Sequence, residues 1–143
     1  EFILYDYNSE IMKRIQNESI INVGVLKKYC YKYYILCPII DESIALIGCP
    51  DKFITCSSKQ FPTISSKINK EKKFSFEVED IANKRLKVLL YSEKEPKNIT
   101  LEKGKSVGKK KVINSWKFEK SIDKLEISLF FEREEKKQII ISY

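Results

Sequence analysis

The sequence predicts an all-β protein, an antiparallel β-sandwich of about seven or eight short strands. Ile, Tyr and Phe are common, whereas the chain has only two alanines. β-Branched and aromatic side chains fit a pleated, half-buried surface better than a helix. Apolar segments recur at intervals of roughly ten residues between polar turns, which is typical of two packed sheets. The 143 residues suit one domain with one core, spanning 1–143.

The first half of the chain is closely divided by turn residues. Residues 10–16 carry apolar side chains at a spacing compatible with one or two helical turns. Pro38 ends the strand before it, because proline lacks the N–H that a central strand donates. Residues 19–26 and 29–37 are expected to form two strands or one long bent strand. Further strands are expected over residues 2–7, 43–49 and 53–56.

The second half contains the clearest strand of the sequence, residues 73–79. Phe74 and Phe76 alternate there with polar residues, which predicts one face on the core and one face in water. A second strand follows at 85–91, and the polar segment 93–111 is expected to be a long exposed loop or ribbon. Three more strands are expected over residues 112–118, 125–131 and 137–143.

The overall composition gives few functional clues. The chain has no histidine and a net charge of +7. Its abundance of Lys, Ile, Tyr and Phe is typical of AT-rich genes, so the charge is weak evidence for an anionic partner. No apolar run reaches the roughly 18 residues of a membrane helix, and the N-terminus lacks a signal-peptide pattern. The chain starts without Met and ends in an apolar run, so we expect a piece of a longer protein.

The four cysteines predict an oxidising compartment. Cys30, Cys37, Cys49 and Cys56 fall in one window, with six, eleven and six residues between them. Even, clustered cysteines are typical of secreted domains, and we expect two disulfides. Nested pairing, Cys30–Cys56 and Cys37–Cys49, follows if the chain folds back near residue 43. The odd spacing within each outer pair weakens this pairing, and the crossed pairing and the third connectivity stay open.

Two alternatives to disulfides are free thiols and a zinc site. Structural zinc usually binds pairs of cysteines separated by two to four residues, and the sequence has no such pair. The sequons at Asn17 and Asn98 are candidate glycosylation sites and fit an exposed, extracellular domain.

No catalytic constellation is visible, and we expect a protein that is not an enzyme and that needs no cofactor or metal. The absence of histidine removes the common triads and histidine-ligated metals. Carboxylates alternate with lysines, as on solvated faces. A basic cluster could contact anionic polymers or lipid head groups, but we favour a solvated loop. Its members are Lys103, Lys105, Lys109, Lys110 and Lys111. Tyrosines at 29, 31, 33 and 34 are expected partly in the core, and Trp116 is expected to anchor it.

Two segments carry a resemblance to a known family. Residues 20–26, with the motif Asn22-Val23-Gly24, and the Tyr-rich segment that runs into Cys37-Pro38 resemble the opening of the third domain of eukaryotic gamete fusogens. This is the hapless or generative-cell-specific family. Residues 72–78 resemble the Phe-rich strand of that domain. The similarity covers residues 19 to 92 and, with the AT-rich composition, suggests a malaria-parasite-like, apicomplexan member.

The resemblance implies an immunoglobulin-like module of a class II membrane-fusion protein. Such a domain folds back against the trimer core and draws two gamete membranes together at fertilisation. Its partners would be the other domains of the same fusogen, in a post-fusion homotrimer, while the opposing membrane is reached through domains outside this chain. We expect a cell-surface ectodomain that is monomeric alone and binds no nucleic acid. The alternative is an adhesive, receptor-binding, cysteine-rich domain of a parasite surface protein.

Overall fold

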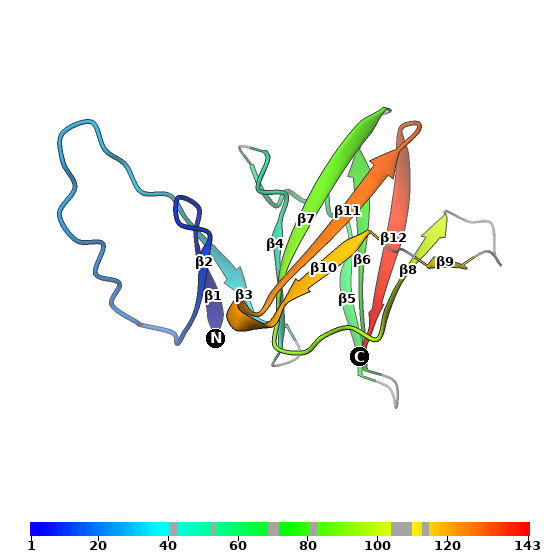
Figure 1. The fold of residues 1–143 in the computed structure, drawn as a ribbon, viewed down its shortest axis with the longest axis horizontal. Helices are drawn as coiled ribbons and strands as arrows, with labels where there is room; N and C mark the ends of the chain where they lie inside the picture. The colour runs from blue at the N-terminus through cyan, green and yellow to red at the C-terminus, as the bar shows by residue number, and fades with distance from the viewer. Residues whose placement is uncertain (41–42, 53, 69–71, 81–82, 104–109, 113–114) are drawn as a thin grey trace.

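The computed structural model describes residues 1–40, 43–52, 54–68, 72–80, 83–103, 110–112 and 115–143. Within these ranges the chain is almost entirely β, with twelve strands, all antiparallel, and one short 3-10 helix, η1 (Lys120–Ile122). The strands form three sheets stacked in layers (Figure 1). The all-β sandwich predicted from the sequence is therefore confirmed, with a third layer and more strands than expected.

The N-terminal sheet has the order β2-β1-β3. It is formed by β1 (Phe2–Asp6), β2 (Ile11–Ile15) and β3 (Tyr34–Pro38). The helical turns expected at residues 10–16 are wrong, because this segment is β2 and pairs with β1. The strands expected over residues 19–33 are wrong as well, because the chain there forms a long loop and regular pairing begins only at Tyr34.

The central sheet has the order β10-β11-β7-β4. It is formed by β4 (Ile44–Gly48), β7 (Lys84–Ser92), β10 (Trp116–Glu119) and β11 (Lys124–Phe131). Every residue of β4 is buried. A strand that is covered on both faces reads as a continuous apolar run, and this is the sequence of β4. The short strand expected at 53–56 does not form over its described residues, 54–56.

The five-stranded sheet has the order β5-β6-β12-β8-β9. It is formed by β5 (Ile64–Ile68), β6 (Lys72–Asp80), β8 (Asn98–Lys103), β9 (Lys110–Val112) and β12 (Glu135–Ser142). Strands β8 and β9 pair with each other, so part of the segment 93–111 is a β-ribbon, which was one of the two structures expected for it. The alternation of Phe74 and Phe76 is confirmed, since both rings are buried.

Two pairs of consecutive strands interlock the two larger sheets. β6 and β7 follow each other in sequence but lie in different sheets, and the same is true of β11 and β12. β6 pairs with β12 in one sheet while β7 pairs with β11 in the other. The main core lies between these sheets and includes Phe76, Phe131 and Ile139, with Trp116 packed at its margin. Trp116, expected to anchor the core, is thus only partly buried, and its anchoring role stays a prediction.

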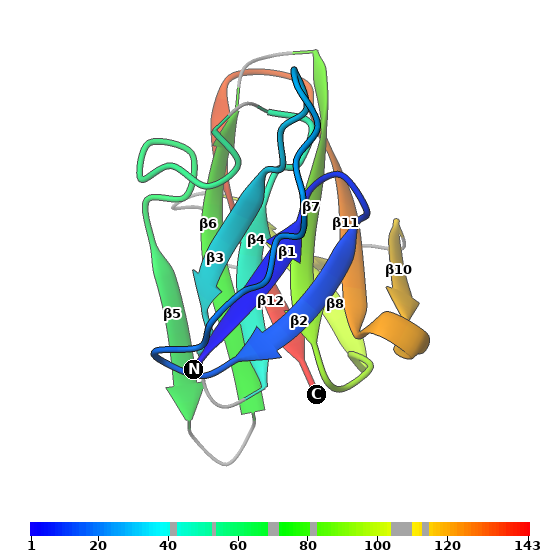
Figure 2. The same ribbon diagram turned by 90° about the vertical axis from the view of Figure 1, so that its left-hand side faces the viewer.

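A second, smaller core joins the N-terminal sheet to the outer face of the central sheet. Ile3, Tyr5 and Cys37 of the first meet Ala45, Ile47, Leu89 and Tyr91 of the second. Figure 2 shows the N-terminal sheet lying in front of the central one. The described residues thus have two hydrophobic cores, on the two faces of the central sheet.

Candidate protein-binding surface

The 16–33 loop joins β2 to β3 and extends away from the three sheets (Figure 1). Connections of this length without regular structure are uncommon in compact domains and are usually functional or disordered. Its composition makes it more unusual, because it is rich in Ile, Val and Tyr, which normally form buried strands.

Both ends of the loop are held to the N-terminal sheet. At its start, the Gln16 Nε2 donates to the carboxylate of Glu1, next to β1, at 2.6 Å, and the backbone N–H of Gln16 donates to the Ser19 Oγ at 3.1 Å. At its end, the N–H of Tyr7 donates to the Tyr33 carbonyl at 2.9 Å, and the two tyrosine rings lie 5.6 Å apart. The loop therefore leaves the sheet from two fixed points.

The middle of the loop exposes large apolar side chains almost completely. The exposed fractions are 98% for Ile20, 96% for Val25 and 91% for Tyr29. Single exposed apolar residues are ordinary, but a group of them on one segment marks an interaction site. Further exposed members are Ile21, Val23, Leu26, Tyr31 and Tyr33. The expectation that the tyrosines of this segment lie partly in the core is therefore wrong for Tyr29 and Tyr31.

Local contacts shape the loop from within. Gly24 has a φ of +70°, and its N–H donates to the Asn22 Oδ1 at 2.8 Å, which closes a tight turn. The Lys32 ammonium donates to the Val23 carbonyl at 2.7 Å and so ties the two arms of the loop together. The Lys28 ammonium lies 5.0 Å from the centre of the Tyr29 ring, a cation–π distance.

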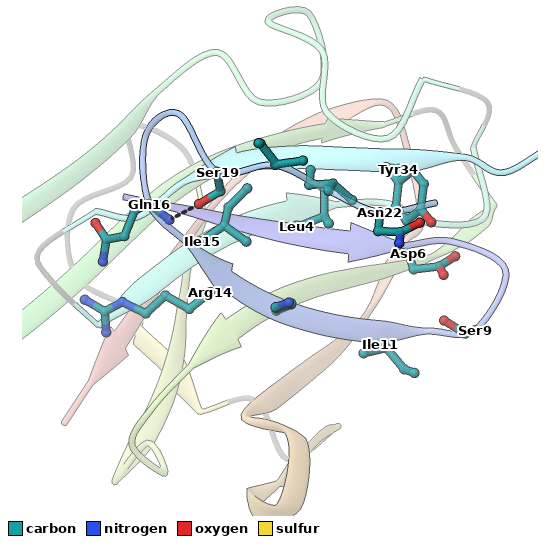
Figure 3. Close-up of a pocket in the computed structure, with 13 residues that line it drawn as sticks. Leu4, Asp6, Ser9, Ile11, Arg14, Ile15, Gln16, Ser19, Asn22 and Tyr34 are labelled. Carbon is teal, nitrogen blue, oxygen red and sulfur yellow. Dashed lines mark hydrogen bonds between the residues drawn. The ribbon is translucent and has the colours of Figure 1, made fainter. Parts of the chain in front are cut away.

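A groove of about 600 Å³ lies between the start of the loop and the N-terminal sheet (Figure 3). It is on the sheet face opposite the small core, because Leu4 and Ile11 alternate with residues that face the core. Its apolar walls come from both the sheet and the loop. They are Leu4, Ile11, Ile15, Ile20, Ile21 and Tyr34.

Charged groups border one end of the groove. Arg14 binds the carboxylates of Glu1 and Glu93, and Gln16 donates to Glu1 at 2.6 Å. The hydrogen bonds from Arg14 and then Gln16 lower the pKa of the Glu1 side chain. The loop itself carries three lysines against one carboxylate. The surface as a whole combines an apolar centre with a basic margin.

None of the four cysteines predicted to form disulfides is joined to another in the structure. All four are free thiols: Cys30 and Cys56 are exposed, whereas Cys37 and Cys49 are buried. Cys37 packs in the small core and Cys49 in the main core, on opposite faces of the central sheet. The two disulfides and their nested pairing, Cys30–Cys56 and Cys37–Cys49, stay a prediction.

The other predicted site residues lie away from the loop's exposed centre or outside the described chain. Asn17 and Asn98 are exposed, as glycosylation requires, and the modification stays a prediction. Lys105 and Lys109 lie outside the described residues, and only the backbone of Lys103, Lys110 and Lys111 is described. Over the described ranges, no group of three or more Cys, Asp or Glu side chains is placed to hold a metal ion, and no helix is long and apolar enough to cross a membrane.

The carboxylates expected on solvated faces include two that are not solvated. Asp80 is buried and pairs with Lys52 at 3.0 Å, and Glu135 is nearly buried and pairs with Lys137 at 3.2 Å. Each of these carboxylates is thus held in an ion pair with a lysine.

Comparison with known proteins leaves the fold and the surface as the guides to function. No family model matches the chain, and neither does any curated protein.

The sequence interpretation missed the groove and the exposed centre of the loop. The available signal was the length of the segment from 16 to 33. It contains a turn motif at Asn22-Val23-Gly24, but its apolar residues form no strand on either side of that turn.

Proposed function

We propose that this chain is a non-catalytic docking module that binds another protein through the 16–33 loop and the groove beneath it. The observation that carries the proposal is the near-complete exposure of Ile20, Val25 and Tyr29 on a loop whose two ends are fixed. Burying such side chains contributes roughly 1.5–3 kcal/mol each, so a partner that covers them gains substantial affinity.

The backbone of the loop favours a protein partner over a lipid surface. Among residues 20–32, all described, four backbone groups form hydrogen bonds: the N–H of Gly24, the carbonyl of Val23, and the pair from Cys30 to Lys27. Hydrocarbon offers nothing to the remaining donors and acceptors, which makes irregular backbone costly in a bilayer. A strand from a partner protein satisfies them, as in β-augmentation.

The charge of the loop indicates the chemistry of the partner. Lys27, Lys28 and Lys32 outnumber Glu18 in the loop, and the whole chain is basic. An extended segment with alternating apolar and acidic residues would match both features, because opposite potentials across an interface favour encounter and fix the register.

A defined peptide library tests the proposal. Extended peptides with alternating apolar and acidic residues are selected on the chain, and amide hydrogen exchange is measured with and without the selected peptides. We expect slower exchange in residues 20–32 and at least tenfold weaker binding for the double variant Ile20→Ser/Val25→Ser. Phe130→Ser is the matched control, because this exposed ring lies on β11, outside the N-terminal sheet.

Two results would contradict the proposal. In one, the selected peptides protect another part of the chain, or bind both variants equally. In the other, phosphatidylserine vesicles but no peptides bind through Ile20 and Val25, which would assign the loop to membranes.

We also propose a narrower role based on the resemblance to gamete fusogens. In this role the chain is the third domain of a class II fusion protein, and it folds back against the other domains at fertilisation. The support is the similarity of residues 19 to 92, a segment that contains most of the 16–33 loop. A bistable docking contact of this kind draws its free energy from differential contacts in two states. Antibodies against the domain should block membrane merger after gametes have attached, whereas inhibition of attachment alone favours the adhesive alternative.

A further inference from the structure

Cys49 and Cys56 lie side by side at the free edge of the central sheet. β4 is the last strand of that sheet, and the chain turns after it and returns alongside. The N–H of Cys49 donates to the Thr55 carbonyl at 2.7 Å, and the N–H of Lys52 donates to the Cys49 carbonyl at 3.0 Å. Residues 49–56 therefore form a short closed loop.

The bond between Cys49 and Thr55 limits the separation of the two cysteine α-carbons. The Cys49 α-carbon is about 1.5 Å from its own nitrogen, and the Thr55 oxygen is about 2.8 Å from the Cys56 α-carbon across a trans peptide. With the 2.7 Å hydrogen bond between them, the α-carbons are at most about 7 Å apart, and closer because the three segments are not collinear. Disulfides span α-carbon distances of roughly 4.4–6.8 Å.

Gly48 provides the room for the Cys56 side chain. A β-carbon placed on residue 48 would lie 3.0 Å from the Cys56 Cβ and 2.1 Å from the Thr55 oxygen. The Cys56 Cβ therefore lies beside the backbone that immediately precedes Cys49.

The other two cysteines are less well placed for Cys49. Cys30 is exposed within the 16–33 loop, and Cys37 belongs to the small core on the other face of the central sheet. Cys37 is the main competitor for Cys56, because a thiolate at Cys56 adds to the effect of burial in raising the pKa of Cys37 to about 12. Burial raises the pKa of Cys49 to about 12, and the Cys56 thiolate is one of the smaller causes that add to it.

We propose that Cys49 and Cys56 are a redox-active pair that forms a disulfide, with Cys56 as the residue that meets the oxidant. This pair belongs to the connectivity Cys30–Cys37 and Cys49–Cys56, and not to the nested pairing favoured by the sequence. Cys56 is exposed, whereas Cys49 is completely buried. The disulfide fastens the returning segment 49–56 to the edge strand β4, and it acts independently of the docking loop.

The oxidation is a thiol–disulfide exchange with a small-molecule disulfide such as oxidised glutathione. The Cys56 thiolate attacks one glutathione sulfur, forms a mixed disulfide and releases the first glutathione thiolate. Cys49 then loses its proton to solvent, attacks the Cys56 sulfur and releases the second. Two protein thiols are oxidised and one glutathione disulfide is reduced to two thiols, so the electrons balance. Burial raises the pKa of both thiols, so the exchange quickens as the pH rises.

Peptide mapping after oxidation identifies the pair. Cleavage after Lys and Arg together with cleavage after Glu places each cysteine on its own peptide, because Glu42 separates Cys37 from Cys49 and Lys52 separates Cys49 from Cys56. In the folded chain treated with oxidised glutathione, we expect the loss of two of the four free thiols and a cross-link between peptides 43–52 and 53–59.

Single substitutions complete the test. Cys30→Ser and Cys37→Ser should keep this cross-link. Cys56→Ser should lose it, and its three remaining cysteines should stay free thiols that an alkylating reagent labels after unfolding. Because Cys56 is exposed, this variant should fold even where Cys49→Ser does not. A dominant cross-link of peptide 53–59 with peptide 33–42 or 29–32 would overturn the proposal, as would four thiols that remain free at equilibrium with the oxidised glutathione.

Discussion

The ammonium group of Lys137 lies 3.2 Å from the Glu135 carboxylate and 4.2 Å from the centre of the Phe131 ring, inside one end of the sandwich. It also donates to the Phe130 carbonyl. Lys137 is buried on the same strand face as Ile139 and Ile141, where an apolar residue would be expected. A buried lysine is tolerated only when it is paired and hydrogen-bonded.

Removing one member of this pair should destabilise the protein more than removing both. We expect Lys137→Met to lower the free energy of unfolding by about 3 kcal/mol, because the nearly buried Glu135 loses its buried counter-ion. The double variant Lys137→Met/Glu135→Met should recover most of that loss. Urea unfolding of the two single variants and the double variant measures the coupling, and strictly additive effects would show that the pair does not act as a unit.

Gly48 should be intolerant of any side chain. Its φ of +101° is strained for other residues, and a β-carbon would overlap the Thr55 oxygen. We expect Gly48→Ala to lower the free energy of unfolding by at least about 2 kcal/mol. The backbone strain contributes about 1–2 kcal/mol, and moving Thr55 away from the new β-carbon adds to it.

Gly24→Ala is the matched control for that substitution. Gly24 also has a positive φ, of +70°, but a β-carbon there meets nothing within 4 Å. We expect a loss of no more than about 1 kcal/mol, measured in the same unfolding experiment. Equal losses at the two positions would mean that contact with Thr55 adds nothing.

The reduced protein should lose stability at alkaline pH. Burial raises the pKa of Cys37 and Cys49 from 9.0 to about 12, and that of Tyr5 and Tyr143 from 10.0 to about 12. The unfolded chain therefore releases these protons first, and the stabilisation present below pH 9 is lost as the pH rises from about 9 to 12. Urea unfolding between pH 7 and pH 11 measures the slope, and a flat profile would contradict it.

Oxidation of Cys49 and Cys56 should stabilise the fold. Closing a loop of about eight residues restricts the unfolded chain by an amount worth on the order of 2 kcal/mol. We expect a higher melting temperature for the oxidised form, which returns to the reduced value when dithiothreitol is added. Cys56→Ser should show no such difference between oxidising and reducing conditions.

The 16–33 loop should be the first site of proteolysis. Lys27 and Lys28 lie in an exposed segment without regular structure, whereas Lys137 is buried within β12. Brief treatment with trypsin should cut after residue 27 or 28 and leave the two larger sheets paired, as shown by mass spectrometry and an unchanged β-type circular dichroism spectrum. Earlier cleavage elsewhere in the described chain would indicate that the loop is held more tightly than its contacts suggest.

The sequence predicted those parts of the fold in which local pattern and tertiary contacts agree. Residues 73–79 alternate because one strand face meets the core. The prediction for residues 11–15 was wrong because their apolar side chains fit both a helical turn and an edge strand. Pairing with β1 makes the segment a strand. The third layer left two local signs, the apolar run of β4 and the run Leu89-Leu90-Tyr91, whose members face the two cores alternately.

The candidate surface was harder to predict for the same physical reason. Composition in residues 19–33 favours strands, but a strand also needs a partner, and the described chain provides none over most of this segment. The proximity of Cys49 to Cys56 depends on a turn and on the missing side chain of Gly48. Neither is encoded in the cysteine spacing, which is the same in both outer pairs.

The positions of the first and last strands constrain the order of folding. β1 is the middle strand of the N-terminal sheet, and β12 lies between β6 and β8 in the five-stranded sheet. During synthesis, β6 and β8 must wait with one side unpaired until the strand that ends at Ser142 leaves the ribosome. The main core can therefore close only at the end of translation of this segment, and until then its apolar strands depend on whatever shields a nascent chain from aggregation.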